Sequence, residues 1–234
     1  MIIQLPNMKL KGLGFLLLGI IFWACDPDKN DMPNDYDYFP LRLNMPLVYQ
    51  VTETRYSAGN SEPTILSWQE KDEAIRISES PDGFPVYIFS RSRRDNPEAP
   101  WQKVKEYSVT RYPDRYLLTL DNTTTVPMIF PINPLTSWDL NAYNTRVEEA
   151  CRYDFLHQEK TIGSLHFPKT IQVSGRDFTN DPIVRYNLGY TQYALGVGLI
   201  FDEQTDYEYC QEQHCYGQQQ IISGLSTIKQ LIAY

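Results

Sequence analysis

Polar and apolar side chains alternate along short stretches of the chain from residue 47 onward, and this pattern constrains the fold more than any other feature. In LVYQVTETRY (47–56), Tyr49 and Val51 point to one side while Gln50 and Thr52 point to the other. A period of two is typical of a β-strand with one buried face and one wet face. We therefore predict an all-β fold, an antiparallel meander forming a curved sheet, half-barrel or sandwich, with few or no helices. Similar alternating stretches, separated by turn-forming residues, lie at 86–92, 101–112, 115–122 and 169–175.

Three segments have weaker patterns. Residues 138–155 have no clean apolar stripe, although they are the best candidate for a helix. Residues 224–234 fit helical spacing, but their β-branched content favours a strand. Gly196 and Gly198 alternate with apolar residues, which predicts a bulge, a bend or the close approach of another backbone. No third glycine and no helix follow, so the pattern does not predict a dinucleotide-binding loop.

The four cysteines are Cys25, Cys151, Cys210 and Cys215. Cys210 and Cys215 flank QEQH, a span that suits the tip of a β-hairpin, and we predict a disulfide between them. Pairing of Cys151 with either one is the alternative, because the loop between Cys210 and Cys215 is very small. A metal site from Cys210, His214 and Cys215 would lack a fourth ligand and the usual zinc spacing. We expect no metal and no cofactor.

The N-terminus has the pattern of an export signal. Lys9 and Lys11 precede an apolar run from Leu13 to Ala24. At about 1.5 Å per helical residue this run spans roughly 18 Å, which is short of the roughly 30 Å of a bilayer core. The residues Phe22-Trp23-Ala24-Cys25 resemble a bacterial lipobox, with bulky residues where Leu and a small residue are commoner. The resemblance implies cleavage before Cys25 and acylation of its thiol, which would hold the chain at a membrane.

The stretch after Cys25 predicts a flexible acidic tether, because it holds five aspartates and almost no aliphatic residue. Asp26, Asp28 and Asn30 match the spacing of an EF-hand calcium loop, but Asp31 stands where the turn requires glycine and the bidentate Glu is missing. We therefore interpret the stretch as a solvated tether. The predicted organisation is a lipoprotein signal peptide (1–24), a tether (25–38) and a single β-rich domain (39–234).

The charge argues against nucleic acid as a partner. The formal net charge is −8, and removal of the signal peptide would take away two lysines. The dense basic run RSRRD (91–95) is interpreted as a solvated turn. Seventeen tyrosines and sixteen prolines among the 234 residues favour strands and turns.

Three stretches resemble a family of uncharacterised lipid-anchored envelope lipoproteins of the Bacteroidota. They are DYFPLRLNMPLVYQV near the predicted mature start, TSWDLNAYNT in the middle and YALGVGLIFDE near the end. In the first stretch, Asn44-Met45-Pro46 occupies a turn that is commonly Gly-Asn, and Leu47 stands where an aromatic residue is frequent. The resemblance implies a lipid-anchored antiparallel β fold and no particular activity. It also implies a location in the cell envelope at the outer membrane, facing the periplasm or the surface.

No catalytic motif is present in the sequence. There is no Gly-x-Ser-x-Gly elbow, His-Glu-x-x-His helix, Walker loop or Cys-x-x-Cys pair, and His157, His166 and His214 stand outside any motif. Glu148 and Glu149 are adjacent, so on a strand they point to opposite faces and are interpreted as solvated charges. We therefore predict no catalytic residue, and a hydrolase with dispersed residues is the least favoured hypothesis.

Aromatic residues supply the candidate binding residues, which are Trp68, Trp101 and Trp138. Rings on a wet face stack on sugars or anchor protein partners, whereas rings on a buried face fill the core. The leading hypothesis is a non-catalytic envelope lipoprotein that binds a protein partner or supports an assembly. The second is a small-ligand or glycan binder that uses the concave face of the sheet.

Overall fold

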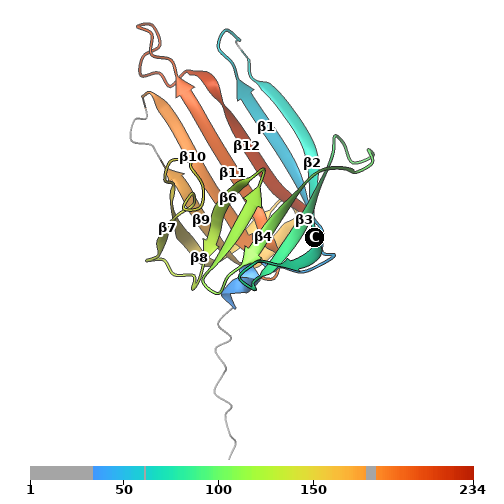
Figure 1. Ribbon diagram of the computed structural model, residues 1–234. Helices are drawn as coiled ribbons and strands as arrows, with labels where there is room; N and C mark the ends of the chain where they lie inside the picture. The colour runs from blue at the N-terminus through green and yellow to red at the C-terminus, as the bar shows by residue number, and fades with distance from the viewer. Residues whose placement is uncertain (1–33, 61, 178–182) are drawn as a thin grey trace, which may run out of the picture. The chain divides into compact units, whose positions relative to one another are not determined.

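The computed structural model describes residues 34–60, 62–177 and 183–234, and within them nearly all regular structure belongs to one antiparallel sheet (Figure 1). The sheet has 12 strands in the order β6-β5-β4-β3-β2-β1-β12-β11-β10-β9-β8-β7. The predicted all-β antiparallel meander is confirmed. The elements are η1 (Asp35–Tyr38), β1 (Leu47–Tyr56), β2 (Thr64–Glu79), β3 (Pro85–Arg94), β4 (Gln102–Arg111), β5 (Arg115–Leu120), β6 (Thr123–Ile129), β7 (Ser137–Asp139), β8 (Ala150–Ile162), β9 (Leu165–Asp177), β10 (Arg185–Ala194), β11 (Gly198–Tyr209) and β12 (Ile221–Ala233).

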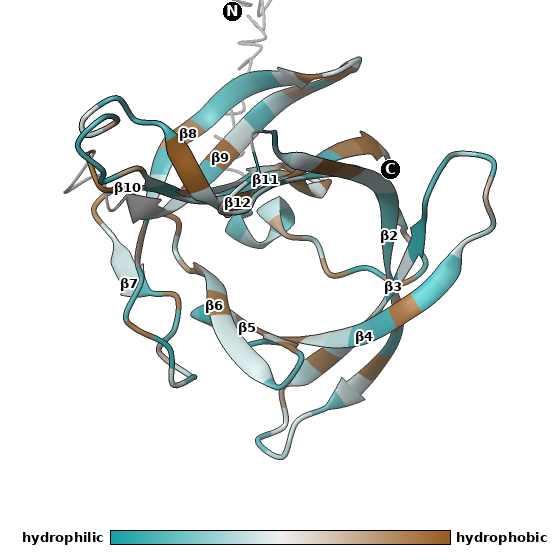
Figure 2. Cartoon of the chain, turned by 90° about the horizontal axis from the view of Figure 1, so that it is seen from above, coloured by the Kyte–Doolittle hydropathy of each residue, from teal (hydrophilic) through white to brown (hydrophobic). Residues whose placement is uncertain are grey.

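The sheet curls into a nearly closed barrel, in which the edge strands β6 and β7 lie near each other (Figure 2). At the middle of the sheet, the pairing of β1 with β12 joins the strands β1–β6 to the strands β7–β12. Side chains and loops bridge the seam between β6 and β7. The Val126 amide donates to the Leu140 carbonyl (2.9 Å), and the Trp138 indole nitrogen donates to the Val126 carbonyl (2.8 Å). The Tyr153 hydroxyl contacts both the amide and the carbonyl of Ile129.

The barrel interior differs along its length. At the end that holds η1, the interior is filled by aromatic and aliphatic side chains, and Tyr38 of η1 is fully buried among them. β1, β2 and β10–β12 extend well past the short strands β5 and β6 and form a tall wall (Figure 1). On the inner face of this wall the paired residues Arg55 and Leu225 are exposed. We call these two parts the packed half and the open half.

The β8–β9 hairpin bends part of the way along its length. Its pairing register shifts between Asp154 and Gln158, where Phe155 and His157 adopt positive φ angles of 50° and 56°. The Tyr38 hydroxyl lies 2.6 Å from His157 Nδ1 and holds the bend. Beyond it the hairpin tip reaches β12, since a Cβ on Gly163 would lie 3.4 Å from Gln230 Nε2.

The structure tests several of the sequence-based boundaries. The C-terminal segment is a strand, as predicted, whereas residues 138–155 contain β7 and the start of β8 instead of a helix. The last residues of the predicted tether belong to the fold, because the Asn34 side chain caps η1 and Asp35 accepts a hydrogen bond from the Ile132 amide (2.8 Å). The predicted signal peptide, Cys25 and the calcium-like spacing lie outside the described residues. Within the part of the chain that is described, no helix is long and apolar enough to cross a bilayer.

Candidate functional site

A cluster of charged side chains lies in the barrel interior, at the edge of the packed half that faces the open half. Alternation along β2 turns Glu70 and Asp72 inward, and Arg91 of β3 and Lys229 of β12 meet them. Arg91 donates to both oxygens of Asp72 (Nε to Oδ1 2.7 Å, Nη2 to Oδ2 2.8 Å). Lys229 Nζ lies 2.9 Å from Asp72 Oδ2 and 3.0 Å from Glu70 Oε2. Two carboxylates and two cations therefore balance one another in a buried network.

The proton affinities in this network follow from its geometry. Burial alone raises the pKa of Asp72, but Lys229 and Arg91 outweigh it and lower that pKa to about 2. The pKa of Glu70 is also lowered, since the same two cations overcome the effect of burial. Both carboxylates are therefore ionised at neutral pH, and the pKa of Arg91 is raised by Asp72 in return, although burial opposes that change.

Aromatic rings and a third carboxyl group surround the network. Lys229 Nζ sits 4.2 Å from the ring centre of Tyr49, and Arg91 Cζ sits 5.2 Å from that of Tyr107. Burial raises the pKa of both phenols. Asp202 lies across from Lys229 in the β11–β12 pairing, and burial raises its pKa. Asp202 therefore takes up a proton more readily than Asp72 does.

A cavity of about 230 Å³ lies next to the network, on the side of the packed half. The segment between η1 and β1 crosses the barrel end here and supplies part of the wall. The rest comes from the β10–β11 turn, the last residue, and Leu47, Asp72 and Phe89 of β1, β2 and β3. The walls are mostly apolar, and Asp72 contributes the carboxyl group. Phe39, Leu47, Phe89 and Val197 are among the apolar residues of the wall.

The predicted glycine pair shapes this cavity. Gly196 and Gly198 adopt φ angles of 80° and 110° in the tight turn between β10 and β11. The Gly196 amide donates to the Asp37 carbonyl (2.7 Å), so the predicted close approach of another backbone is present. A Cβ on Gly198 would lie 3.5 Å from Leu47 Cδ1. The glycines therefore let the turn pack against the crossing segment.

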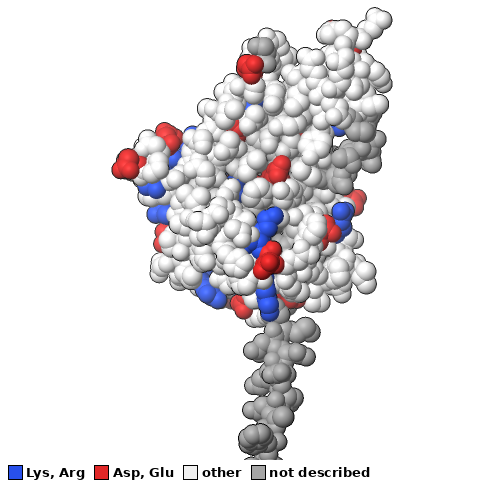
Figure 3. All heavy atoms as spheres, turned by 180° about the vertical axis from the view of Figure 1, so that it is seen from behind, with Lys and Arg blue, Asp and Glu red and all other residues white. Residues whose placement is uncertain are grey.

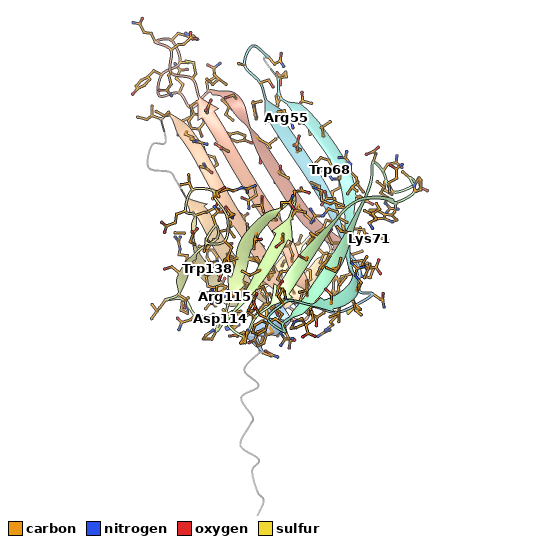
Figure 4. The ribbon with its side chains drawn as sticks, viewed as in Figure 1. Arg55, Trp68, Lys71, Asp114, Arg115 and Trp138 are labelled. Atoms are coloured by element: carbon orange, nitrogen blue, oxygen red, sulfur yellow. A yellow bond between two sulfur atoms is a disulfide. The ribbon has the colours of Figure 1, made fainter. Side chains whose placement is uncertain are left out.

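The three candidate tryptophans do not form one surface; Figure 4 shows Trp68 and Trp138 far apart on the barrel, and Trp101 contacts Lys71 and Arg94. Trp68 is 8% exposed inside the barrel, where its indole nitrogen donates to Glu70 and Arg93 covers its ring. Trp138 packs on Tyr153 at the seam. Trp101 stacks against Arg94 and Lys71, which alternate with the inward residues of their strands and so lie on the outer face.

Two interpretations of charged residues need correction. The basic run RSRRD is not a solvated turn, because its first four residues belong to β3 and Arg91 is part of the interior network. Glu149 is not solvated either, since it is only 8% exposed, whereas Glu148 is exposed. Glu70, Asp72 and Lys229 lie on the inward faces of β2 and β12, but the residues around them do not alternate regularly between polar and apolar, so no local pattern marked these three residues.

The described cysteines have different environments. Cys210 and Cys215 are joined by a disulfide at the tip of the β11–β12 hairpin, with their Cα atoms 5.8 Å apart. Cys151 is free and buried, and burial, reinforced by Glu149 and Asp139, raises its thiol pKa to about 12. Such a thiol is a poor nucleophile at neutral pH. A Cβ on Gly175 would lie 2.8 Å from Glu149 Oε1, so a larger residue there would require the Glu149 side chain to shift.

The comparisons with known proteins are sparse. The sequence matches no known family model and no curated protein. A crystal structure from Bacteroides fragilis, of a protein described as a candidate exported protein with a YmcC-like fold, aligns at 11% identity with a TM-score of 0.37. The alignment covers 83% of this chain and 98% of that chain. A likeness at this level shows nothing about what the chain binds.

Proposed function

We propose that this chain is a lipid-anchored envelope protein that acts as a non-catalytic binder of a small, mostly apolar ligand. The observation that carries the proposal is the cavity of about 230 Å³ beside the charged network. An engineered cavity of about 150 Å³ with apolar walls is large enough to bind benzene. The space here accommodates a substituted ring or a short acyl chain in contact with Phe39, Leu47 and Phe89.

The network beside the cavity favours binding over catalysis. A general base must have an oxygen free to accept a proton from the substrate. Both oxygens of Asp72 already accept hydrogen bonds from Arg91, and one also contacts Lys229. The low pKa of Asp72 makes it a weak base as well. We therefore infer that the Asp72 carboxylate stabilises the cavity wall and takes no part in a reaction.

The anchor rests on the N-terminal sequence, where an apolar run ends at Cys25 and an acidic stretch follows. Several acyl chains on one cysteine hold a protein firmly, at about 0.8 kcal/mol for each buried methylene. In cells, a Cys25→Ser variant is expected to lose acylation and to leave the membrane fraction or remain uncleaved. Unchanged retention together with normal processing would rule out this anchor.

The cavity is tested by filling it. The Val197→Phe variant places a ring in the cavity, and the matched Val104→Phe variant places the same ring on the exposed face of β4, where Val104 is 49% exposed. Calorimetric titration with octanol is expected to show binding to the native chain and to Val104→Phe. Binding to Val197→Phe should weaken by more than about tenfold, equivalent to 1.4 kcal/mol.

Native mass spectrometry of the protein purified from its own envelope would show whether a small molecule occupies the cavity. Leu47→Phe serves as a second filling variant if Val197→Phe does not fold. Equal octanol binding by the filled and control variants, both correctly folded, would contradict the proposed site.

One observation favours a protein partner as a second function. The outer face of the tall wall carries few charged side chains over its upper part (Figure 3). Tyr56, Tyr186 and Tyr207 cluster there, with ring centres 5.3 Å and 6.3 Å apart for the two neighbouring pairs. Tyrosine is enriched at protein interfaces. Mild crosslinking in the native envelope, followed by mass spectrometry, should recover a stoichiometric partner whose crosslinks map to this face.

A further inference from the structure

The tip of the β11–β12 hairpin is held by hydrogen bonds that do not depend on its disulfide. The Cys210 amide donates to the Gln220 carbonyl (2.7 Å), and the Cys215 and Tyr216 amides both donate to the Glu212 carbonyl (3.0 and 2.9 Å). The Gln218 side chain donates to the His214 carbonyl (2.9 Å). Because these bonds involve the backbone at both ends of the loop, the loop is expected to keep its shape when the two sulfur atoms separate.

Four side chains of metal-binding types gather at this tip. Ligand atoms of Cys210, His214 and Cys215 all lie within 4.8 Å of one another. A fourth donor is Glu212, whose Oε2 atom lies 3.4 Å from His214 Nδ1. The side chains of Glu212 and His214 are 77% and 71% exposed, so both can reorient at little cost. Cys210 and Cys215 form the buried side of the group.

We propose that reduction of the Cys210–Cys215 disulfide turns this tip into a four-donor site for Zn²⁺, with Cys210, Glu212, His214 and Cys215 as ligands. Thiolate, imidazole and carboxylate are the groups that bind Zn²⁺ in tetrahedral sites. Cys210, His214 and Cys215 alone lack a fourth ligand and the usual zinc spacing, and Glu212 supplies the fourth ligand. The site is independent of the cavity and of the proposed ligand.

The chemistry balances with a dithiol as reductant. The dithiol transfers two electrons and two protons to the disulfide and becomes a cyclic disulfide, leaving two thiols on the protein. Zn²⁺ then displaces both thiol protons, which pass to solvent, and binds the two thiolates. Disulfide and metal exclude each other, because both use the same two sulfur atoms.

The geometry of the loop suits both states. At a Zn–S distance of about 2.3 Å, two sulfurs of a tetrahedral site lie roughly 3.8 Å apart. The Cα atoms of Cys210 and Cys215 are 5.8 Å apart, so rotation about the side-chain bonds is enough to separate the sulfurs. The metal therefore requires no movement of the strands.

The experiment compares the full chain in its oxidised and reduced forms. The protein is reduced with a dithiol, which is removed without air, and is then titrated with Co²⁺ as a spectroscopic substitute for Zn²⁺. We expect thiolate charge-transfer and tetrahedral ligand-field absorption in the reduced protein only, and displacement of Co²⁺ by an equal amount of Zn²⁺. Zn²⁺ addition should release two protons per site.

Single-residue variants test which side chains bind the metal. His214→Ala and Glu212→Gln alter exposed side chains, and each is expected to weaken Zn²⁺ binding by more than about tenfold, at least the loss usual for an outer-shell partner. Cys210→Ser should abolish the charge-transfer band. Cys151→Ser is the matched control, because this buried thiol lies outside the group and its loss should leave binding unchanged.

The proposal is overturned if the reduced chain, shown to be folded by circular dichroism, gives no thiolate–Co²⁺ absorption. Equal binding by the native chain and His214→Ala would also overturn it. Binding that is lost in Cys151→Ser instead would place the metal elsewhere and contradict the proposed ligand set.

Discussion

Two arginine–aspartate pairs in this barrel have nearly the same geometry and very different surroundings. In the packed half, Arg91 donates hydrogen bonds to both oxygens of Asp72 at 2.7 and 2.8 Å. The Arg91 side chain is 20% exposed and the Asp72 side chain is 6% exposed. In the open half, Arg185 also donates hydrogen bonds to both oxygens of Asp206. Here the Arg185 side chain is 50% exposed and the Asp206 side chain is 38% exposed. The hydrogen-bonding geometry alone therefore does not distinguish the two pairs.

The difference lies in the number of partners and in the access of water. Asp72 also contacts Lys229, and it sits beside Tyr49 and Tyr107 where water is excluded. Removing one member of such a group leaves a charge buried without compensation, which is costly. Asp206 can exchange its arginine for water at little cost. We therefore expect the chain to lose stability when a charge of the packed half is removed, and to lose little when a charge of the open half is removed.

The largest effect is expected from Lys229→Met, which keeps the volume of the side chain and removes its charge. Glu70 and Asp72 are then left with Arg91 as their buried cation, so unfolding by urea should show a loss of about 3–5 kcal/mol. The matched variant Lys105→Met breaks an exposed pair with Asp121 and should cost less than about 1 kcal/mol. Similar losses for the two variants would show that the network is not a stabilising unit.

Acidification should produce the next largest effect. The folded pKa of Asp72 is about 2, below its usual value of 3.8, so its contribution is present at neutral pH and is lost as the pH falls from about 5 to 2. The shift corresponds to about 2 kcal/mol. Glu70 has a lowered pKa and acts in the same direction. The free energy of unfolding, measured by urea denaturation at several pH values, should fall through this window.

Asp202 provides an internal check on the sign. Burial raises its pKa, so protonation of Asp202 favours the folded chain as the pH falls and opposes the effect of Asp72. The Asp202→Asn variant should therefore lose stability more steeply with falling pH than the native chain does. A shallower acid profile in this variant would contradict the assignment.

An intermediate effect is expected at the seam that closes the packed half. Tyr153→Phe removes the hydroxyl that contacts both backbone groups of Ile129, and this should cost about 1–2 kcal/mol. Tyr143→Phe is the control, because its hydroxyl accepts one bond from Arg115 and the ring is 48% exposed. Thermal unfolding should separate the two variants, and equal melting temperatures would mean that the seam does not depend on Tyr153.

The smallest effect is expected for Asp206→Asn in the open half. The pair with Arg185 is exposed, so urea unfolding should change by less than about 1 kcal/mol. Asp72→Asn makes the same substitution in the packed half and should cost several times more. If the two substitutions cost the same, the distinction between the two halves is wrong.

The fold class was accessible from the sequence because strand alternation is a local property. Tyr49 and Val51 lie inside the barrel, and the stretch around them alternates with the expected period. The segment 224–234 was predicted as a strand from its β-branched residues, and it forms most of β12. By contrast, the residues of η1 were predicted as part of a tether, since burial of Tyr38 depends on strands far away in the sequence.

The candidate site was largely hidden from sequence reasoning. Arg91 falls in a dense basic run that resembles a solvated turn, and its partner Asp72 lies on another strand. Trp68 was singled out as a candidate binding residue, but its indole group is occupied by Glu70 and Arg93 inside the barrel. The cavity itself is formed by segments from both ends of the chain, which no local pattern brings together.

The sequence by itself determined that the chain forms antiparallel strands with one buried face, because alternation and turn residues act over a few neighbours. It also carries the apolar run and Cys25 from which the anchor is proposed. Tertiary structure decided that β1 pairs with β12, and this pairing brings Lys229 to Asp72. A charge is stable inside a protein only when its partners surround it, and here Lys229 of β12 reaches the β2–β3 hairpin from the far end of the chain.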